Sequence, residues 1–109
     1  MEFFSEGESL VCVIDNFILA LKLTDENQVN DIIEFVQAIN ENLCTQDGDI
    51  KRLAFLPYRD DGGDYSVMAS NGENNLAYST GDEKTATDIC IFFDTVFRVV
   101  IKKALDIGM

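Results

Sequence analysis

Carboxylates are the groups in this chain that could do chemistry, and they are concentrated in its first half. Residues 1–50 carry eleven acidic side chains and a single base, Lys22, which gives this half a net charge of −10. Residues 51–109 carry nine acids and seven bases, and the whole chain has a net charge of −12. A field of one sign attracts oppositely charged partners and repels nucleic-acid phosphates and anionic membranes. We therefore expect a basic protein as the partner, with no direct binding of nucleic acid or membrane.

The most regularly spaced carboxylates fall in one predicted helix. Glu34 and Glu41 are seven residues apart, so they lie on one side of the helix about 10 Å apart by rise, with Asp31 beside them. No lysine or arginine occurs between Leu23 and Ile50, although a surface that only keeps a protein soluble usually mixes both signs. The candidate partner-binding residues are Glu26, Asp31, Glu34, Glu41, Asp47 and Asp49. The alternative is a solvated helix face without a partner.

The sequence offers little for catalysis or metal binding. It has no histidine, so no imidazole base is present to activate a serine or cysteine nucleophile. Asp60, Asp61 and Asp64 flank two glycines, but they lack the residue order and the closing glutamate of an EF-hand. Hairpin-turn chemistry explains these aspartates better. We expect no enzyme activity, no cofactor and no metal.

The cysteines and the N-terminal segment indicate a cytoplasmic protein. Cys12, Cys44 and Cys90 are widely spaced and odd in number, so we expect buried or half-buried thiols rather than a disulfide framework. Residues 1–8 carry three acids and no base, the opposite of a signal peptide. The longest apolar stretch, residues 9–23, is interrupted by polar side chains and is too short to span a bilayer.

These groups must be positioned by the elements of one small acidic α+β domain, residues 1–109. Apolar residues at helical spacing predict a helix from about 25 to 44, with Thr24 as its N-cap. A longer helix is predicted from about 82 to 106, and its apolar stripe places it in the centre of the core.

Three short segments bounded by turn residues are predicted to be strands: 52–56, 65–69 and 76–79. Their close spacing predicts an antiparallel meander. The predicted fold is therefore a three-stranded antiparallel meander packed against two or three helices, with the long C-terminal helix central.

The segment 9–23 fits two structures. As a helix it gathers Leu10, Ile14 and Phe17 on one face, and this interpretation is slightly favoured. As a hairpin it places Asp15 and Asn16 at a two-residue turn between runs of β-branched residues.

Two residues of the last predicted helix, Phe92 and Val99, lie off its core stripe and nearly on one line. If the core leaves them and Ile91 uncovered, they form an apolar oligomer interface and the protein is a homodimer. If the helix is covered on two sides, they belong to the interior.

The favoured hypothesis is a non-enzymatic acidic inhibitor that binds the basic surface of a nucleic-acid-handling protein. Phage anti-CRISPR, anti-restriction and DNA-mimic proteins share this profile of small size and acidity, an analogy of class rather than of residues. The alternatives are a self-associating structural or ligand-binding module and a toxin-immunity or chaperone-type binding protein.

Overall fold

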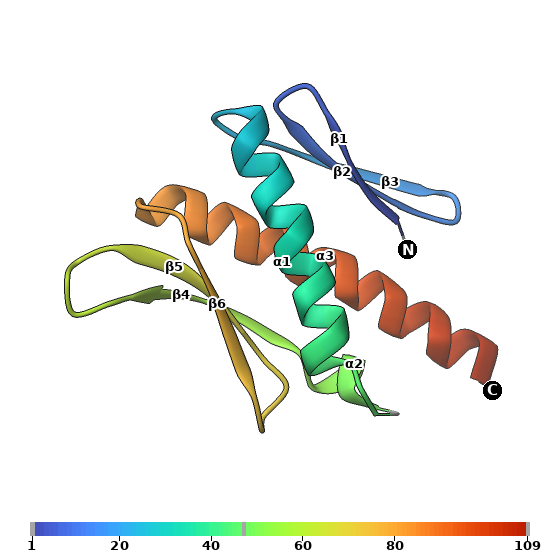
Figure 1. The fold of residues 1–109 in the computed structure, drawn as a ribbon. Helices are drawn as coiled ribbons and strands as arrows, with labels where there is room; N and C mark the ends of the chain where they lie inside the picture. The colour runs from blue at the N-terminus through green and yellow to red at the C-terminus, as the bar shows by residue number, and fades with distance from the viewer. Residues whose placement is uncertain (1, 47, 109) are drawn as a thin grey trace.

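The computed structural model describes residues 2–46 and 48–108, with side chains as far as Val99. These residues form two three-stranded antiparallel sheets and three helices, which confirms the predicted α+β class. Sheet A contains β1 (Glu2–Glu6), β2 (Ser9–Ile14) and β3 (Phe17–Lys22), and sheet B contains β4 (Ala54–Arg59), β5 (Tyr65–Ser70) and β6 (Asn75–Ser79). The helices are α1 (Glu26–Leu43), α2 (Asp49–Arg52) and α3 (Glu83–Gly108). Figure 1 shows α1 crossing α3, with sheet A above the crossing and sheet B below it.

Sheet A replaces the helix that was favoured for residues 9–23, and that prediction was wrong. β2 and β3 form the alternative hairpin, in which Ile14 pairs with Phe17 across the two-residue turn Asp15-Asn16. Asp15 has a φ of 50°, the left-handed conformation that such turns require and that aspartate tolerates. The β-branched residues around it pack better on a pleated sheet than in a helix, so the local preference and the turn agree.

β1 was not predicted from the sequence, where residues 1–8 were considered only for their charge. It pairs antiparallel with β2, from Glu2 opposite Val13 to Glu6 opposite Ser9. Gly7, at a φ of 60°, makes the turn between the two strands. The burial of β2 explains why its sequence shows no clear alternation, because Leu10 and Cys12 are buried on one face and Val11 on the other.

Helix α1 follows sheet A and begins one residue later than predicted. Its N-cap is Asp25 rather than Thr24, and the Asp25 carboxylate accepts a hydrogen bond from the Gln28 amide at 2.8 Å. Thr24 takes part from outside the helix, since its amide and hydroxyl both donate to the Gln28 side-chain oxygen. These bonds satisfy free groups at the start of α1, and the apolar stripe of the helix decides which side faces solvent.

Sheet B is the predicted meander with small changes in its boundaries. The first strand begins at Ala54 rather than residue 52, because Lys51 and Arg52 belong to the short helix α2. Pro57 lies within β4, which is an edge strand and therefore loses no ladder hydrogen bond on its outer side. The turn to β5 is closed by Asp60, whose carboxylate accepts from the Asp64 amide at 3.0 Å. This bond agrees with the turn interpretation of the aspartate-rich loop.

Helix α3 contacts both sheets and forms the centre of the core, as predicted. Phe93 is fully buried and its ring lies near five others, with centroid distances from 5.3 Å to Phe55 to 6.4 Å to Phe97. The other three rings come from sheet A, α1 and the adjacent position of α3: Phe3, Phe35 and Phe92. Burying an aromatic side chain of this size contributes several kcal/mol, on the order of 3–5 relative to alanine. α3 is therefore the scaffold on which the other elements are placed.

Candidate binding surface

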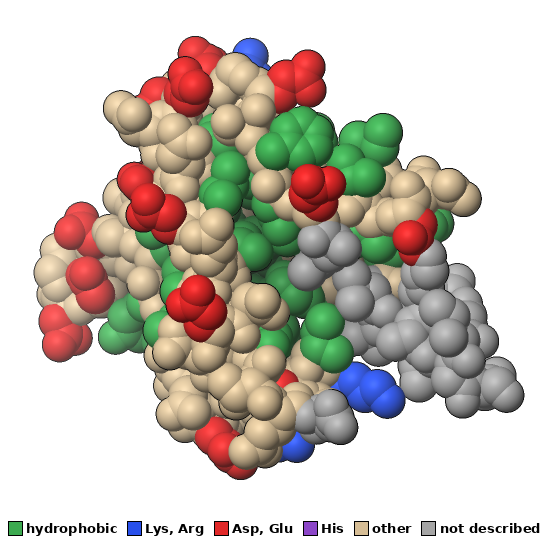
Figure 2. Space-filling model, turned by 45° about the vertical axis from the view of Figure 1, so that its right-hand side comes forward, with side chains coloured by type: hydrophobic (Ala, Val, Ile, Leu, Met, Phe, Trp, Pro, Cys, Tyr) green, Lys and Arg blue, Asp and Glu red, His purple; other side chains and the backbone are tan. Residues whose placement is uncertain are grey.

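The outward side of α1 carries three exposed carboxylates, Glu26, Glu34 and Glu41, which we call the α1 acidic stripe. The helical period places them on the side opposite the buried residues Ile32 and Ile39, and they extend over roughly 22 Å by helical rise. Figure 2 shows acidic side chains distributed over this region of the molecule, with few blue ones among them. The stripe is therefore a rigid row of negative charge presented to solvent.

No ion pair neutralises this stripe within the described residues. The two ion pairs found there are both on α3, between Lys84 and Asp88 at 2.8 Å and between Arg98 and Asp94 at 3.0 Å. Both are exposed pairs four residues apart, which contribute little to stability but do neutralise charge locally. The negative potential over α1 consequently reaches into solvent, where it is reduced mainly by salt.

Asp31 is exposed and lies one helical turn before Glu34, on the side of the stripe that faces β6. Tyr78 of β6 packs its ring 5.8 Å from that of Phe35, centroid to centroid. Burial raises the pKa of the Tyr78 hydroxyl, and the carboxylates of Asp31 and Asp25 raise it further. Asp31 therefore adds negative charge to the β6 side of the stripe, beside a phenol that stays protonated at neutral pH.

Asp49 does not belong to the surface, which corrects its place among the candidate partner-binding residues. It is only 4% exposed, and its carboxylate accepts hydrogen bonds from the amides of Thr45 (3.1 Å) and Gln46 (2.9 Å). A short aspartate placed after a turn can satisfy free amides of that turn, and this use holds it inside the fold. The other candidate in this region, Asp47, lies outside the described residues.

A hollow of about 520 Å³ runs alongside α1, and we call it the α1 groove. Its floor is apolar and comes from three elements that are distant in sequence: Phe3 of β1, Ile33, Val36 and Ile39 of α1, and Phe97 of α3. Figure 2 shows apolar side chains lining a depression on this face. Its volume lies within the range of protein binding sites, roughly 300–1,000 Å³.

The rim of the α1 groove is polar and acidic on the α1 side. Gln37 and Asn40 line it, and Gln37 lies one helical turn from both Glu34 and Glu41 of the acidic stripe. Glu2 of β1 lines the groove from another element. An apolar floor thus lies beside the carboxylates of the α1 acidic stripe, an arrangement that the sequence did not reveal because it depends on the packing of β1 against α1.

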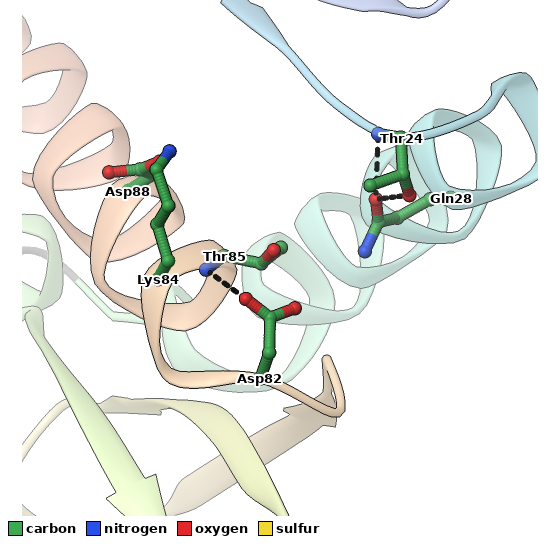
Figure 3. A network of polar contacts seen from close by, with 6 residues as sticks. All are labelled: Thr24, Gln28, Asp82, Lys84, Thr85 and Asp88. Atoms are coloured by element: carbon green, nitrogen blue, oxygen red, sulfur yellow. Dashed lines mark hydrogen bonds and ion pairs between the residues drawn. The ribbon is translucent and has the colours of Figure 1, made fainter.

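A second hollow, about 480 Å³, lies where α1 and α3 begin, and its polar side chains satisfy one another (Figure 3). Asp82 caps α3 by accepting from the Thr85 amide at 2.9 Å, and this bond lowers the pKa of the Asp82 carboxyl. Lys84 is paired with Asp88 on the next turn. These bonds are explained by the capping of α1 and α3 and by one i,i+4 ion pair.

The predicted oligomer residues do not form an exposed stripe. Phe92 is 8% exposed and belongs to the core, while Val99 is half-buried against it. The large apolar side chain that α3 does expose in this region is Ile91, at 60%. Phe92 fits the second alternative, a helix that is covered on two sides. A homodimer remains a prediction, but Phe92 and Val99 do not form the centre of its interface.

The outer face of sheet A is an apolar surface that sequence analysis missed. Phe4, Val11 and Ala20 form one cross-strand row, and Val13 pairs with Ile18 in the next. Ile18 is 72% exposed and Phe4 is 41% exposed. The alternation of β1 and β3 could have revealed this face, but only once residues 9–23 were assigned to a hairpin.

The remaining chemical groups are structural. Cys12 and Cys90 are buried and Cys44 is half-buried, as predicted for unpaired thiols. Burial raises the pKa of Cys12 and of Cys90 to about 11, so both stay protonated at neutral pH and are weak nucleophiles. Within the described ranges, no group of three acidic or cysteine side chains is arranged to hold a metal ion.

Comparison with protein families, with curated proteins and with solved structures finds no match to this chain. None of the helices in the described part of the chain is long and apolar enough to cross a membrane.

Proposed function

We propose that this protein is a non-enzymatic inhibitor whose α1 acidic stripe docks on the basic surface of a nucleic-acid-handling protein in the cytoplasm. The observation that carries the proposal is the unpaired row formed by Glu26, Glu34 and Glu41. Carboxylates held on a rigid helix keep their spacing, so they can meet a complementary surface without a large loss of conformational entropy. Asp31 adds charge at the edge of this surface.

The class of partner follows from the kind of surface that a row of carboxylates complements. Proteins that handle DNA or RNA bind the phosphate backbone with lysine and arginine side chains. A row of carboxylates can occupy such a surface and exclude the nucleic acid, which is how an anti-CRISPR, anti-restriction or DNA-mimic protein would act. Association driven in this way is fast and weakens steeply as salt screens the charges.

A capture experiment that compares the wild type with a charge-reversed variant tests this proposal. The wild-type protein and the double variant Glu34→Lys/Glu41→Lys serve as bait in host lysate, and bound proteins are identified after washes at low and high salt. We expect the wild type to retain a basic nucleic-acid enzyme that elutes as salt rises, and the variant to retain none. Equal recovery by both baits, with both folded by circular dichroism, would show that the stripe is not the site.

Self-association is the second candidate function. The outer face of sheet A supports it better than Phe92 and Val99, the residues first considered for an interface. This face is apolar in the middle, with Glu6 and Lys22 at opposite ends of one cross-strand row through Ser9. Two copies packed face to face by a two-fold axis could place opposite charges together at both edges. The variant Ile18→Ser should then convert a dimer into a folded monomer in sedimentation, and a monomeric wild type would remove this candidate.

A toxin-immunity or chaperone-type protein would use the same acidic stripe. The identity of the captured partner separates it from an inhibitor of a nucleic-acid enzyme.

A further inference from the structure

We propose that the α1 groove receives an amphipathic helix of the basic partner, with the apolar side of that helix on the groove floor and its lysines and arginines over the surrounding carboxylates. This inference rests on the proposed function and names the part of the partner that α1 recognises. It assigns the specific contact to the groove and the long-range attraction to the α1 acidic stripe.

The shape of the groove fits a helix. Its walls include two helices, α1 and α3, and its apolar residues extend from Ile33 of α1 to Cys44, the C-cap of that helix. Eleven residues of helical rise separate these two positions, about 16 Å, which is the length of roughly three turns of a docked helix. Apolar anchors on one side of such a helix enter a groove of this kind at positions i, i+3 or i+4, and i+7.

Charge selects the occupant of the groove. Gln37 on its rim has Glu34 three residues before it and Glu41 four residues after it, and Glu2 lines the groove from β1. A helix whose apolar side is flanked by bases meets carboxylates there, whereas one flanked by acids is repelled. Among the described residues, three bases follow groove-lining residues in the chain: Lys51 and Arg52 after Ile50 at the far end, and Arg98 after Phe97. Arg98 is paired with Asp94, so the basic flanks of the bound helix lie over the Ile33–Asn40 part, beside Glu34 and Glu41.

The other apolar surface, on the outside of sheet A, makes a weaker candidate for this partner. It carries Glu2 and Glu6 on one edge strand and Lys22 on the other, so it shows no consistent preference for positive charge. It is also formed by a sheet face rather than by a hollow. The groove combines a concave apolar floor with carboxylates of one sign, and this combination is what the inference uses.

A labelled peptide tests the groove directly. The probe is a helical peptide of about 14 residues with leucines at positions i, i+3 and i+7 and lysines flanking them, and binding is followed by fluorescence anisotropy. The variant Gln37→Arg/Asn40→Arg places two bases on the groove rim at exposed positions. We expect its affinity for the peptide to fall by about tenfold or more because like charges then face each other.

The matched control is Asn27→Arg/Asn30→Arg, which adds the same two charges to exposed positions of the same helix, outside the groove lining. We expect this variant to lose no more than about threefold in affinity. An equal loss in both variants, or no loss in either, overturns the groove as the site. A different experiment decides the proposed function: it is overturned if the Glu34→Lys/Glu41→Lys bait still captures the partner.

A native thiol provides a second readout that does not depend on any variant. Cys44 is half-buried and lines the groove, whereas Cys12 and Cys90 are buried elsewhere. The peptide should slow alkylation of Cys44 by N-ethylmaleimide, followed by mass spectrometry. A peptide with glutamates in place of lysines, or with a central proline that breaks the helix, should give no protection. Protection by either of these peptides would show that the groove does not select a basic helix.

Discussion

Helices α1 and α3 use charge in opposite ways on their exposed sides. α3 pairs its charges four residues apart, Lys84 with Asp88 and Arg98 with Asp94, so its surface is close to neutral locally. α1 exposes a row of glutamates with no base on the helix and no ion pair within the described residues. The chain can therefore build a solvated helix of mixed charge. The uniform sign on α1 is a property of that helix rather than of the whole surface.

The two helices also differ inside the protein. α3 places Phe93 in contact with rings from both sheets and from α1, and among its described side chains the buried ones extend from Ala86 to Phe97. α1 buries one stripe and leaves the opposite side to solvent. The comparison suggests a division in which α3 maintains the fold and α1 presents a surface, and each prediction below tests that division.

The largest expected effect is on α3. Replacing Phe93 with alanine removes the central ring of the core and leaves a cavity, so the free energy of unfolding should fall by about 3–5 kcal/mol. Urea denaturation followed by circular dichroism measures the loss. A decrease below about 1 kcal/mol would mean that α3 is not the scaffold.

The next effect separates a structural carboxylate from the exposed ones. Asp49→Ala leaves the amides of Thr45 and Gln46 without their acceptor, and we expect a loss of about 1–3 kcal/mol in urea denaturation. Asp49→Asn retains one acceptor oxygen and should lose less. Unchanged stability of Asp49→Ala, together with weaker partner binding, would return this residue to the binding surface.

The pH dependence of the free energy of unfolding tests whether the Cys90 thiol of α3 is buried. The folded-state pKa of the Cys90 thiol is raised by burial from 9.0 to about 11, so the folded state keeps a proton that the unfolded state releases above pH 9. Stability should therefore fall as the pH rises from 9 toward 11, by less than about 1 kcal/mol at pH 9.5 for this thiol. Cys90→Ala, compared with the wild type at each pH by urea denaturation, should show a shallower decline. Identical slopes would indicate that Cys90 is not buried.

The smallest stability effect is expected on α1. Glu34→Lys/Glu41→Lys changes exposed side chains without ion pairs, so the free energy of unfolding should stay within about 0.5 kcal/mol of the wild type. The equivalent reversal on α3, Asp88→Lys/Asp94→Lys, breaks both ion pairs and places like charges four residues apart, so it should be the less stable of the two. Equal stability of the two variants in urea would weaken the contrast between the helices.

The sequence predicted the elements whose pattern is local. The helical spacing of Val29, Ile32 and Ile39 located α1, and that of Ile89, Phe93 and Val96 located α3. The segment 9–23 was assigned to the wrong element because β2 is central in its sheet. Leu10 and Cys12 are buried on one face and Val11 on the other, so the alternation that marks a half-exposed strand is absent.

The candidate site was predicted only in part, for the same physical reason. The exposure of Glu26, Glu34 and Glu41 follows from the helical period alone, and the structure places all three outside. The burial of Asp49 depends on the path of the turn before α2, and the α1 groove depends on where β1 and α3 meet α1. The groove depends on contacts between distant parts of the chain, which no local pattern encodes, whereas the hydrogen bonds that hold Asp49 join residues only three and four positions apart.

The most direct test of the central claim is the association rate constant of the captured partner with two charge-reversed variants over a range of salt concentrations. Glu34→Lys/Glu41→Lys and Asp88→Lys/Asp94→Lys change the net charge of the protein by the same amount but on different helices. If α1 presents the binding surface, the α1 variant associates about tenfold or more slowly with a flattened salt dependence, while the α3 variant stays near the wild type. Equal slowing of both variants would show that the partner responds to net charge, and that the α1 acidic stripe has no particular role.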